Sequence, residues 1–483
     1  MLAIPTDDQK AEGLQAKKFH FSFTKLSEYY KILNVILFVN DWKGRETVTW
    51  LNSYFQLDKL NTTIKREILA GITTFISMSY ILFVNPNVLG AAKMDTGAVF
   101  TATALASALG CLLMGFLARY PIATAPALGI NAFFSYSVVI GMGVDWQTAL
   151  AGVFVASLIF LLITIFKLRE MIINAIPSDL KYAISSGIGL FIAFLGLHQG
   201  GLVVANKSTV VGLGSFTTPT TWLTIFGLLV TTILMIRKVP GAIFIGMFLT
   251  AGLGLVTGLI KMPARLISGA PSLAPTFGVA VKHVGEINTP QMWVVVLTFL
   301  LVTFFDTAGT LVGLAQQAGF MRNNQMLRVG KALMSDSTAM LAGSIFGTSP
   351  VGAYVESSAG IAVGGRSGLT AVVTGICFLV GMLFSPLLTV VTDQVTAPAL
   401  IIVGVLMAQS LKYVDWGHLE VAVPSFLIVL GMPLTYSISD GMALGLIMYP
   451  ICMIAAKRGR EVHPIMYALF FIFIIFMWVL TVG

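Results

Sequence analysis

Residues 347–360 read GTSPVGAYVESSAG and lie between long apolar runs. The stretch carries one carboxylate, four hydroxyl side chains besides the tyrosine, and the helix-breaking pair Pro350 and Gly352. Inside a membrane, an interrupted helix and a charge are tolerated only where they line a cavity or are buried in protein. The stretch therefore predicts a functional cavity, provided that the chain is a membrane protein.

The composition indicates that it is one. Of 483 residues, 57% are hydrophobic and only 10% are charged, whereas soluble domains average about 25% charged residues. The net charge of +8 is explained by basic loops on one side of a membrane, so nucleic acid is not expected as a partner. The three cysteines and the histidines lack metal or disulfide spacing, and there is no phosphate-binding Walker loop. We therefore expect no metal, no cofactor and no ATP-driven step, and no catalytic constellation indicates an enzyme.

Apolar segments long enough to cross a bilayer recur along nearly the whole chain. The sequence predicts a polar N-terminal extension (1–60), a first repeat (61–262), a second repeat (288–457) and an additional C-terminal apolar segment (458–483). The first seven spans are expected near 67–86, 97–118, 127–142, 147–167, 181–198, 220–236 and 240–260. The second seven are expected near 291–315, 329–346, 354–365, 368–391, 395–411, 419–436 and 438–456. A short apolar run at 32–39 lacks a cleavage site, so no cleavable signal peptide is expected.

The basic residues support this layout. Lys65 and Arg66 precede the first span, which predicts a cytoplasmic N-terminus. With spans alternating from there, the cytoplasmic loops collect fourteen Lys and Arg residues and the outer loops five. Because seven is odd, the second repeat would enter the membrane in the opposite sense to the first. That arrangement, an inverted repeat, is common in secondary transporters.

The two halves contain a short matching sequence. Residues 123–131 and 347–352 both have Thr-x-Pro followed shortly by Gly, and each is followed by a polar side chain, Asn131 or Glu356. Paired interrupted spans of this kind indicate a binding site near the middle of the membrane.

Further polar side chains lie within the second set of spans. Asp306 is near the middle of the eighth span, where insertion of a carboxylate costs about 2.5–3.5 kcal/mol. Thr307 and Thr310 are helical neighbours of Asp306 or of each other, which predicts an inward-facing polar stripe. Phe305 could stack on a flat ligand. The alternative for Asp306 is a structural carboxylate, hydrogen-bonded within the bundle or protonated.

Glu356 is expected in the first turn of a half-helix, followed by Ser357. The helix terminus favours its charged form and desolvation its neutral form, and the sequence leaves open which effect dominates. Its structural alternative is a helix cap. Asn131 could bind a heterocycle or cap the third span, and Asp336 in the ninth span could serve a proton path or a structural role.

Several motifs together resemble those of the AzgA-like hypoxanthine/guanine/adenine permeases, a branch of the nucleobase–cation symporter superfamily that includes the nucleobase–ascorbate transporters. The motifs are ILAGITTF (68–75), YILFVNP (80–86), PALGINAFF (126–134), FFDTAGTL (304–311), GTSP through ESSAG (347–360) and GGRSGLT (364–370). The resemblance covers roughly residues 60–457 in order.

The resemblance implies an all-α polytopic membrane protein with about fourteen spans in two inverted seven-span repeats. It implies a core and a gate domain, with short extended stretches in the third and tenth spans meeting at the substrate. The family's acids of the eighth and tenth spans match Asp306 and Glu356, and its asparagine of the third span matches Asn131. The expected substrate residues are therefore Asp306, Glu356, Asn131, Thr310, Ser357 and Phe305, and the proton-coupling candidates are Glu356, Asp306 and Asp336.

The predicted function is import of purine nucleobases across a bacterial cytoplasmic membrane, by proton symport with alternating access. The partners would be a purine, a proton and the lipid bilayer, and a homodimer is an open candidate for the assembly. One alternative is a pyrimidine or anion carrier on the same fold, although acidic residues at the interrupted spans disfavour an anion. Another is an intramembrane enzyme that uses Asp306 and Glu356 as an acid–base pair.

Overall fold

The computed structural model describes residues 45–166, 176–206, 208–263, 265–322 and 325–482. The chain divides into two compact units, residues 1–54 and 55–483. The described part of the first unit, residues 45–54, belongs to the helix α2 (Arg45–Phe55). The apolar run at 32–39 and most of the predicted extension lie outside the described residues.

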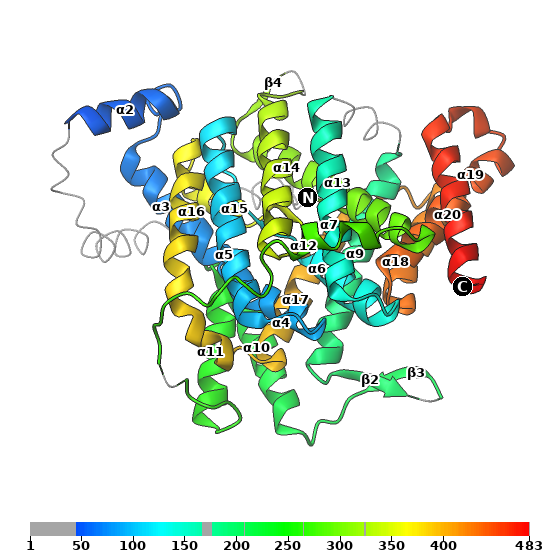
Figure 1. Ribbon diagram of the computed structural model, residues 1–483, viewed down its shortest axis with the longest axis horizontal. Helices are drawn as coiled ribbons and strands as arrows, with labels where there is room; N and C mark the ends of the chain where they lie inside the picture. The colour runs from blue at the N-terminus through cyan, green and yellow to red at the C-terminus, as the bar shows by residue number, and fades with distance from the viewer. Residues whose placement is uncertain (1–44, 167–175, 207, 264, 323–324, 483) are drawn as a thin grey trace, which may run out of the picture. The chain divides into compact units, whose positions relative to one another are not determined.

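The second unit is almost entirely helical (Figure 1). Its first half contains, in order, α3 (Ile64–Met78), α4 (Ile81–Ala91), α5 (Thr96–Leu113), the π-helix η3 (Met114–Ala118), β1 (Thr124–Pro126), α6 (Leu128–Ala132), the π-helix η4 (Phe133–Gly141), α7 (Trp146–Ile165), α9 (Ser178–Gln199), the hairpin β2 (Val203–Asn206) and β3 (Val210–Leu213), α10 (Pro219–Ile236) and α11 (Ala242–Val256). A connection with two short helices, α12 (Val279–Lys282) and η5 (Val284–Glu286), leads to the second half.

The second half repeats the pattern of a short strand followed by a short helix. It contains α13 (Pro290–Gln317), the hairpin β4 (Met321–Arg322) and β5 (Gln325–Met326), α14 (Val329–Phe346), β6 (Val351–Ala353), α15 (Ser357–Val363), α16 (Gly368–Gly381), η6 (Met382–Val390), α17 (Asp393–Ala408), η7 (Gln409–Tyr413), α18 (Leu419–Thr435), α19 (Ile438–Ala455), η8 (Gly459–Glu461) and α20 (Pro464–Val482).

Local sequence signals explain where several of these helices begin. The Thr63 hydroxyl accepts from Arg66 N at the start of α3, and the Asp95 carboxylate accepts from Ala98 N at the start of α5, at 2.7 Å. Such side-chain caps satisfy N–H groups that have no partner within the helix. Pro219 and Pro290 occupy the first positions of α10 and α13, where a missing N–H costs nothing.

Length and apolarity identify the membrane spans. Among the described residues, eight helical segments are long and apolar enough to cross a bilayer: Ile64–Ala91, Thr96–Ala118, Trp146–Ile165, Ser178–Gln199, Pro219–Ile236, Gly368–Val390, Asp393–Tyr413 and Ile438–Ala455. Five further helical segments are apolar but shorter. The helices of the third and tenth spans are short because part of each span is a strand, β1 or β6. The multi-span, helical fold is confirmed, and the count of about fourteen spans stays a prediction.

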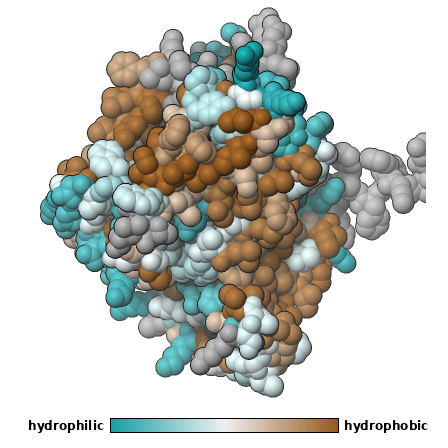
Figure 2. Space-filling view, turned by 90° about the vertical axis from the view of Figure 1, so that its right-hand side faces the viewer, coloured by the Kyte–Doolittle hydropathy of each residue, from teal (hydrophilic) through white to brown (hydrophobic). Residues whose placement is uncertain are grey.

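The helices of the second unit form two packed groups. In one group α3 and α5 pack on α16, and α14 packs on α5 and α7; Figure 1 shows α3, α5 and α16 running side by side. In the other group α9 packs on α17 and α18, α18 packs on α19, and α10 and α11 pack on each other and on α17. Large apolar side chains remain exposed on the outer helices, among them Phe426 and Leu434 of α18 and Phe471 of α20. Figure 2 shows broad hydrophobic areas on one face, as a lipid-facing surface requires.

Candidate functional site

Two interrupted segments, 123–131 and 347–360, cross in the interior. Strand β1 pairs antiparallel with β6, with Thr124 opposite Ala353 and Pro126 opposite Val351. The ladder continues on both sides, because Ala127 N donates to Pro350 O and Tyr354 N donates to Ala123 O, each at 3.0 Å. Both strands are fully buried. The prediction of short extended stretches in the third and tenth spans is confirmed.

A glycine ends α14 before this crossing. Gly347 is the C-cap of α14 and has φ +97°, a left-handed conformation that side chains with a Cβ rarely adopt. A Cβ added there would lie 2.2 Å from Cβ of Thr276. The helix therefore stops at this residue, and Pro350, which lacks an N–H, begins the extended stretch.

A buried cluster of amides and hydroxyls joins the two segments to the first span. The Ser349 hydroxyl donates to Oδ1 of Asn131. Nδ2 of Asn85 donates to the hydroxyls of Thr103 at 2.7 Å and Thr348 at 2.8 Å. All five side chains are fully or almost fully buried. In the structure Nδ2 of Asn131 has no partner among the described residues, so this amide has donors available for a ligand.

Glu356 lies immediately before α15, in the N-cap position. Its side chain makes no capping hydrogen bond, so the alternative role as a helix cap is not the one observed. Instead its Oε1 accepts from the hydroxyl of Tyr80 at 2.5 Å. Tyr80 is 1% exposed and connects α3 to α4, whereas Glu356 is half-buried. The protein thus donates a hydrogen bond to one oxygen of this carboxylate.

The next residue, Ser357, is fully buried. Its hydroxyl accepts from Ala123 N at 3.0 Å, across 234 residues of sequence. This bond ties the start of α15 to the segment that precedes β1. Ser357 therefore contributes to the crossing itself, and a direct substrate contact remains a proposal.

The eighth span is a continuous helix, α13, which packs against β6 and α15. Asp306 and Phe305 belong to this helix, but their side chains lie outside the described residues. Of the predicted polar stripe, Thr307 is fully buried and Thr310 is half-buried. Near the end of α13, Nε2 of Gln317 donates to Ser358 O at 3.3 Å. The backbone therefore brings α13 to the crossing, and the roles of Asp306 and Phe305 stay predictions.

Asp336, the other predicted acid, is fully buried in α14. The neighbouring hydroxyls connect α14 to two other helices: Ser335 donates to Leu113 O at 3.1 Å, and Ser337 lies 3.0 Å from the Thr164 hydroxyl. These contacts surround Asp336 with tightly packed structure. Its role in a proton path and its structural role stay predictions.

Glu67 is a buried carboxylate to which the sequence analysis assigned no role. It is fully buried near the start of α3 and accepts from five donors at 2.6–3.1 Å: the hydroxyls of Thr62, Ser367 and Thr370, and the backbone N–H groups of Arg366 and Ser367. The loop between α15 and α16 is thereby fixed to the first span. An acidic residue within the first turn of an apolar span was the available signal, but it also fits an ordinary helix start.

Polar contacts also connect the two helix groups at one end of the molecule. Nε2 of Gln199 on α9 donates to the Tyr136 hydroxyl on η4, and the Ser137 hydroxyl donates to Tyr436 O at 3.2 Å. Nearby, Asn87 Nδ2 donates to Asp393 Oδ1 at 3.1 Å. The Tyr136 and Tyr436 rings meet edge-on with centroids 6.0 Å apart. We call these three hydrogen bonds the inter-group contacts.

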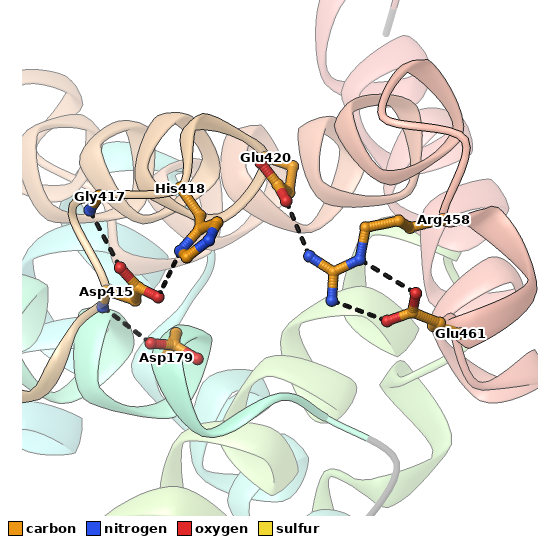
Figure 3. Close-up of polar contacts among 7 residues, drawn as sticks. All are labelled: Asp179, Asp415, Gly417, His418, Glu420, Arg458 and Glu461. Carbon is orange, nitrogen blue, oxygen red and sulfur yellow. Dashed lines mark hydrogen bonds and ion pairs between the residues drawn. The ribbon is translucent and has the colours of Figure 1, made fainter.

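A set of exposed ion pairs joins loops and helix starts of the second group (Figure 3). Arg458 donates to Glu420 and to Glu461, both at 2.7 Å. The hydrogen bond to Glu461, and then that to Glu420, raises the pKa of Arg458, and Arg458 in turn lowers the pKa of Glu461. Asp415 pairs with His418 at 2.7 Å and accepts from Gly417 N; these bonds lower the pKa of Asp415. Because these partners are exposed, apart from the half-buried Glu420, we assign these pairs a modest stabilising role.

Known proteins resemble this chain in sequence and in fold. A model described as "Permease family" matches residues 65–444, which include both crossing segments. The chain belongs to this permease family. It is 54% identical to the guanine/hypoxanthine permease PbuG of Bacillus subtilis, over 88% of this chain and 99% of that protein. It is 41% identical to the adenine permease AdeQ of Escherichia coli, over 88% of this chain and 95% of that protein. The resemblance inferred from the motifs is confirmed.

The fold of this permease is also found in solved transporters. The transmembrane domain of the cyanobacterial bicarbonate transporter BicA superposes with a TM-score of 0.56, over 81% of this chain and 97% of that domain, at 16% identity. At that identity the likeness concerns the fold alone. It confirms that the permease is a multi-pass membrane protein of the inverted-repeat type.

Proposed function

We propose that this permease imports purine nucleobases, hypoxanthine, guanine or adenine, by proton symport with alternating access. The observation that carries the proposal is the crossing of β1 and β6, which places Asn131 in one interrupted segment and Glu356 in the other. A purine presents N–H donors and nitrogen or carbonyl acceptors on a flat edge. A carboxylate can accept from its N–H groups, and an amide with available donors can bind its acceptors. The printed names of PbuG and AdeQ support the same substrate class.

Proton symport would supply the driving force. A proton crossing with the base gains about 2.3 kcal/mol per 100 mV of membrane potential and about 1.4 kcal/mol per pH unit. At 100 mV alone this corresponds to roughly fiftyfold accumulation, since each 1.4 kcal/mol is tenfold. Glu356 is the first candidate for the proton carrier, with Asp306 and Asp336 as alternatives. Thr310, Ser357 and Phe305 complete the proposed substrate residues.

The remaining parts of the proposal concern orientation and organisation. We place the N-terminus in the cytoplasm, with repeats at 61–262 and 288–457 and an additional segment at 458–483. In this orientation the inter-group contacts lie on the outer side and must break when the site opens outward. An oligomer such as a homodimer is compatible with the broad apolar surface.

A carrier for pyrimidines or anions is the alternative, since BicA carries this fold and is named a bicarbonate transporter. A carboxylate at the crossing disfavours an anion through like-charge repulsion. Uptake of labelled hypoxanthine, guanine, adenine, uracil and bicarbonate into cells that lack their own permeases tests the choice, with and without a protonophore. We expect purine uptake that the protonophore abolishes. Uracil or bicarbonate uptake without purine uptake would refute the substrate class, and protonophore-resistant purine uptake would refute only the coupling.

A further inference from the structure

Tyr80 and Glu356 lie 276 positions apart and share one hydrogen bond, with the Tyr80 hydroxyl 2.5 Å from Oε1 of Glu356. Tyr80 occupies the junction where α3 ends at Met78 and α4 begins at Ile81. Its side chain is 1% exposed, so its hydroxyl cannot turn toward bulk water instead. The backbone at the junction is fixed as well, because Val84 N donates to Tyr80 O at 2.9 Å. The donor is therefore preorganised toward the carboxylate.

A hydrogen bond of this kind stabilises the charged form of a carboxylate in a low-dielectric environment. Without a ligand, the Glu356 carboxylate lacks the N–H groups that a purine would offer. The hydroxyl of Tyr80 is then a side-chain donor that offsets the burial of the carboxylate. Because the bond uses Oε1, Oε2 is left for the transported proton and the ligand. Tyr80 can thus stabilise the carboxylate of the empty carrier without competing with the substrate for the same oxygen.

We propose that Tyr80 is a positioning residue for proton coupling, which stabilises the Glu356 carboxylate in the empty carrier so that the carrier returns without its proton. This inference rests on the proposed function. In the loading step a proton from solvent forms an O–H bond with the Glu356 carboxylate as the base binds. In the release step that bond breaks and the proton enters solvent on the other side. A carrier that kept the proton during its return would exchange bases but would not accumulate them.

The test uses the full-length protein in sealed proteoliposomes and compares the Tyr80→Phe variant with wild type. Two rates are measured with labelled hypoxanthine: exchange against internal hypoxanthine at equal pH, and uphill uptake driven by an acidic exterior. Exchange does not require the empty carrier to return, whereas accumulation does. The matched control is Tyr467→Phe, which removes a hydroxyl that donates to Gly459 O at 2.9 Å, near the start of α20.

We expect Tyr80→Phe to keep exchange within about threefold of wild type and to lose accumulation by roughly tenfold or more, since a hydrogen bond to a charged group contributes at least that factor. Tyr467→Phe should change neither rate. Infrared spectroscopy of the empty proteins provides an independent readout. At neutral pH, Tyr80→Phe should show a protonated-carboxyl band that the additional change Glu356→Gln removes, and wild type should lack it.

Three outcomes would overturn the inference. Wild-type accumulation by Tyr80→Phe would show that the hydroxyl is dispensable for coupling. Equal loss of exchange and accumulation, with no carboxyl band, would show a structural role. A wild-type protein that exchanges hypoxanthine but never accumulates it would refute the proposed proton symport and this inference with it. The first two outcomes leave the proposed function intact. Failure of this inference can therefore be distinguished from failure of the proposed function.

Discussion

The Thr370 hydroxyl donates to Oε2 of Glu67 at 2.6 Å, although the two residues lie 303 positions apart. The bond joins the start of α3 to the start of α16. In the loop between α15 and α16, the N–H groups of Arg366 and Ser367 donate to the same carboxylate. A short helix of seven residues, α15, cannot hold its own orientation by helix stability alone. Glu67 therefore fixes one end of the half-helix whose other end carries Glu356.

Replacing Glu67 by Ala should destabilise the protein by roughly 2–4 kcal/mol, because five donors, four of them buried, would lose their acceptor. Thermal unfolding of the detergent-solubilised protein measures this, with Glu286→Ala as the control, since that glutamate is 52% exposed at the end of the short helix η5. Glu67→Gln keeps one acceptor oxygen and should lose less. Unfolding of Glu67→Ala at the control's temperature would contradict the prediction.

Glu356→Gln should abolish or severely weaken purine transport while membrane insertion stays normal. The amide keeps the size of the side chain but cannot carry a transported proton. Labelled purine uptake is compared at equal protein content in the membrane, with Glu286→Gln as the matched glutamate substitution outside the spans. Wild-type rates in Glu356→Gln would remove this residue from the site.

Ser349→Ala should raise the KM for purines about five- to thirteenfold with little change in membrane content. The Ser349 hydroxyl holds the amide of Asn131, and a lost hydrogen bond costs about 1–1.5 kcal/mol. Asn131→Ala should have a larger effect. If Ser349 acts through Asn131, the double variant should be no worse than Asn131→Ala alone, whereas additive effects would indicate independent roles.

Gln199→Ala should open the end of the molecule where the inter-group contacts lie, because the bond to Tyr136 is removed. A cysteine at Thr392, beside the Asp393 contact, reports opening through labelling by a membrane-impermeant maleimide, with Cys377 and Cys452 changed to Ser. Labelling should rise about fivefold, the population shift expected for about 1 kcal/mol. His198→Ala, one position away, serves as the control. Unchanged labelling in Gln199→Ala would show that this bond does not hold the groups together.

The Glu461–Arg458 pair should make stability depend on pH in the acidic range. Because Arg458 lowers the pKa of Glu461, the carboxylate contributes stability above its unfolded pKa of about 4.3. That contribution is lost as the pH falls through the lower folded value. Glu461→Gln should therefore unfold at a lower temperature than wild type at pH 7, and the difference should vanish as carboxylates become protonated. High salt should also shrink the difference, and a difference independent of pH and salt would argue against the pair.

The membrane location, the inverted-repeat fold and the pair of interrupted segments could be predicted from the sequence. The spans and the interruption follow from local patterns, because about twenty consecutive apolar residues cross a bilayer and Pro350 with Gly352 in a polar stretch disfavours a continuous helix. The inverted repeat follows from the odd number of predicted spans in each half and from the family resemblance. The same reasoning singled out Asn131 and Glu356, because a polar side chain beside an interruption is costly unless it is used. It also singled out Asp306 and Asp336, whose roles stay predictions.

Only the tertiary structure decided which groups these residues meet. Glu356 accepts from Tyr80, Asn131 from Ser349, and Glu67 from Thr370, across 276, 218 and 303 residues of sequence. A tyrosine in an apolar span has no local feature that marks it as a donor to a distant acid, since many aromatic residues there only pack. Hydrogen-bond partners depend on which helices and strands lie together. For residues 347–360, the pairing of β6 with β1 determines which segments are neighbours. The interruption of the tenth span was evident from the amino-acid sequence, but the hydrogen-bond partners of its residues come from the first and third spans.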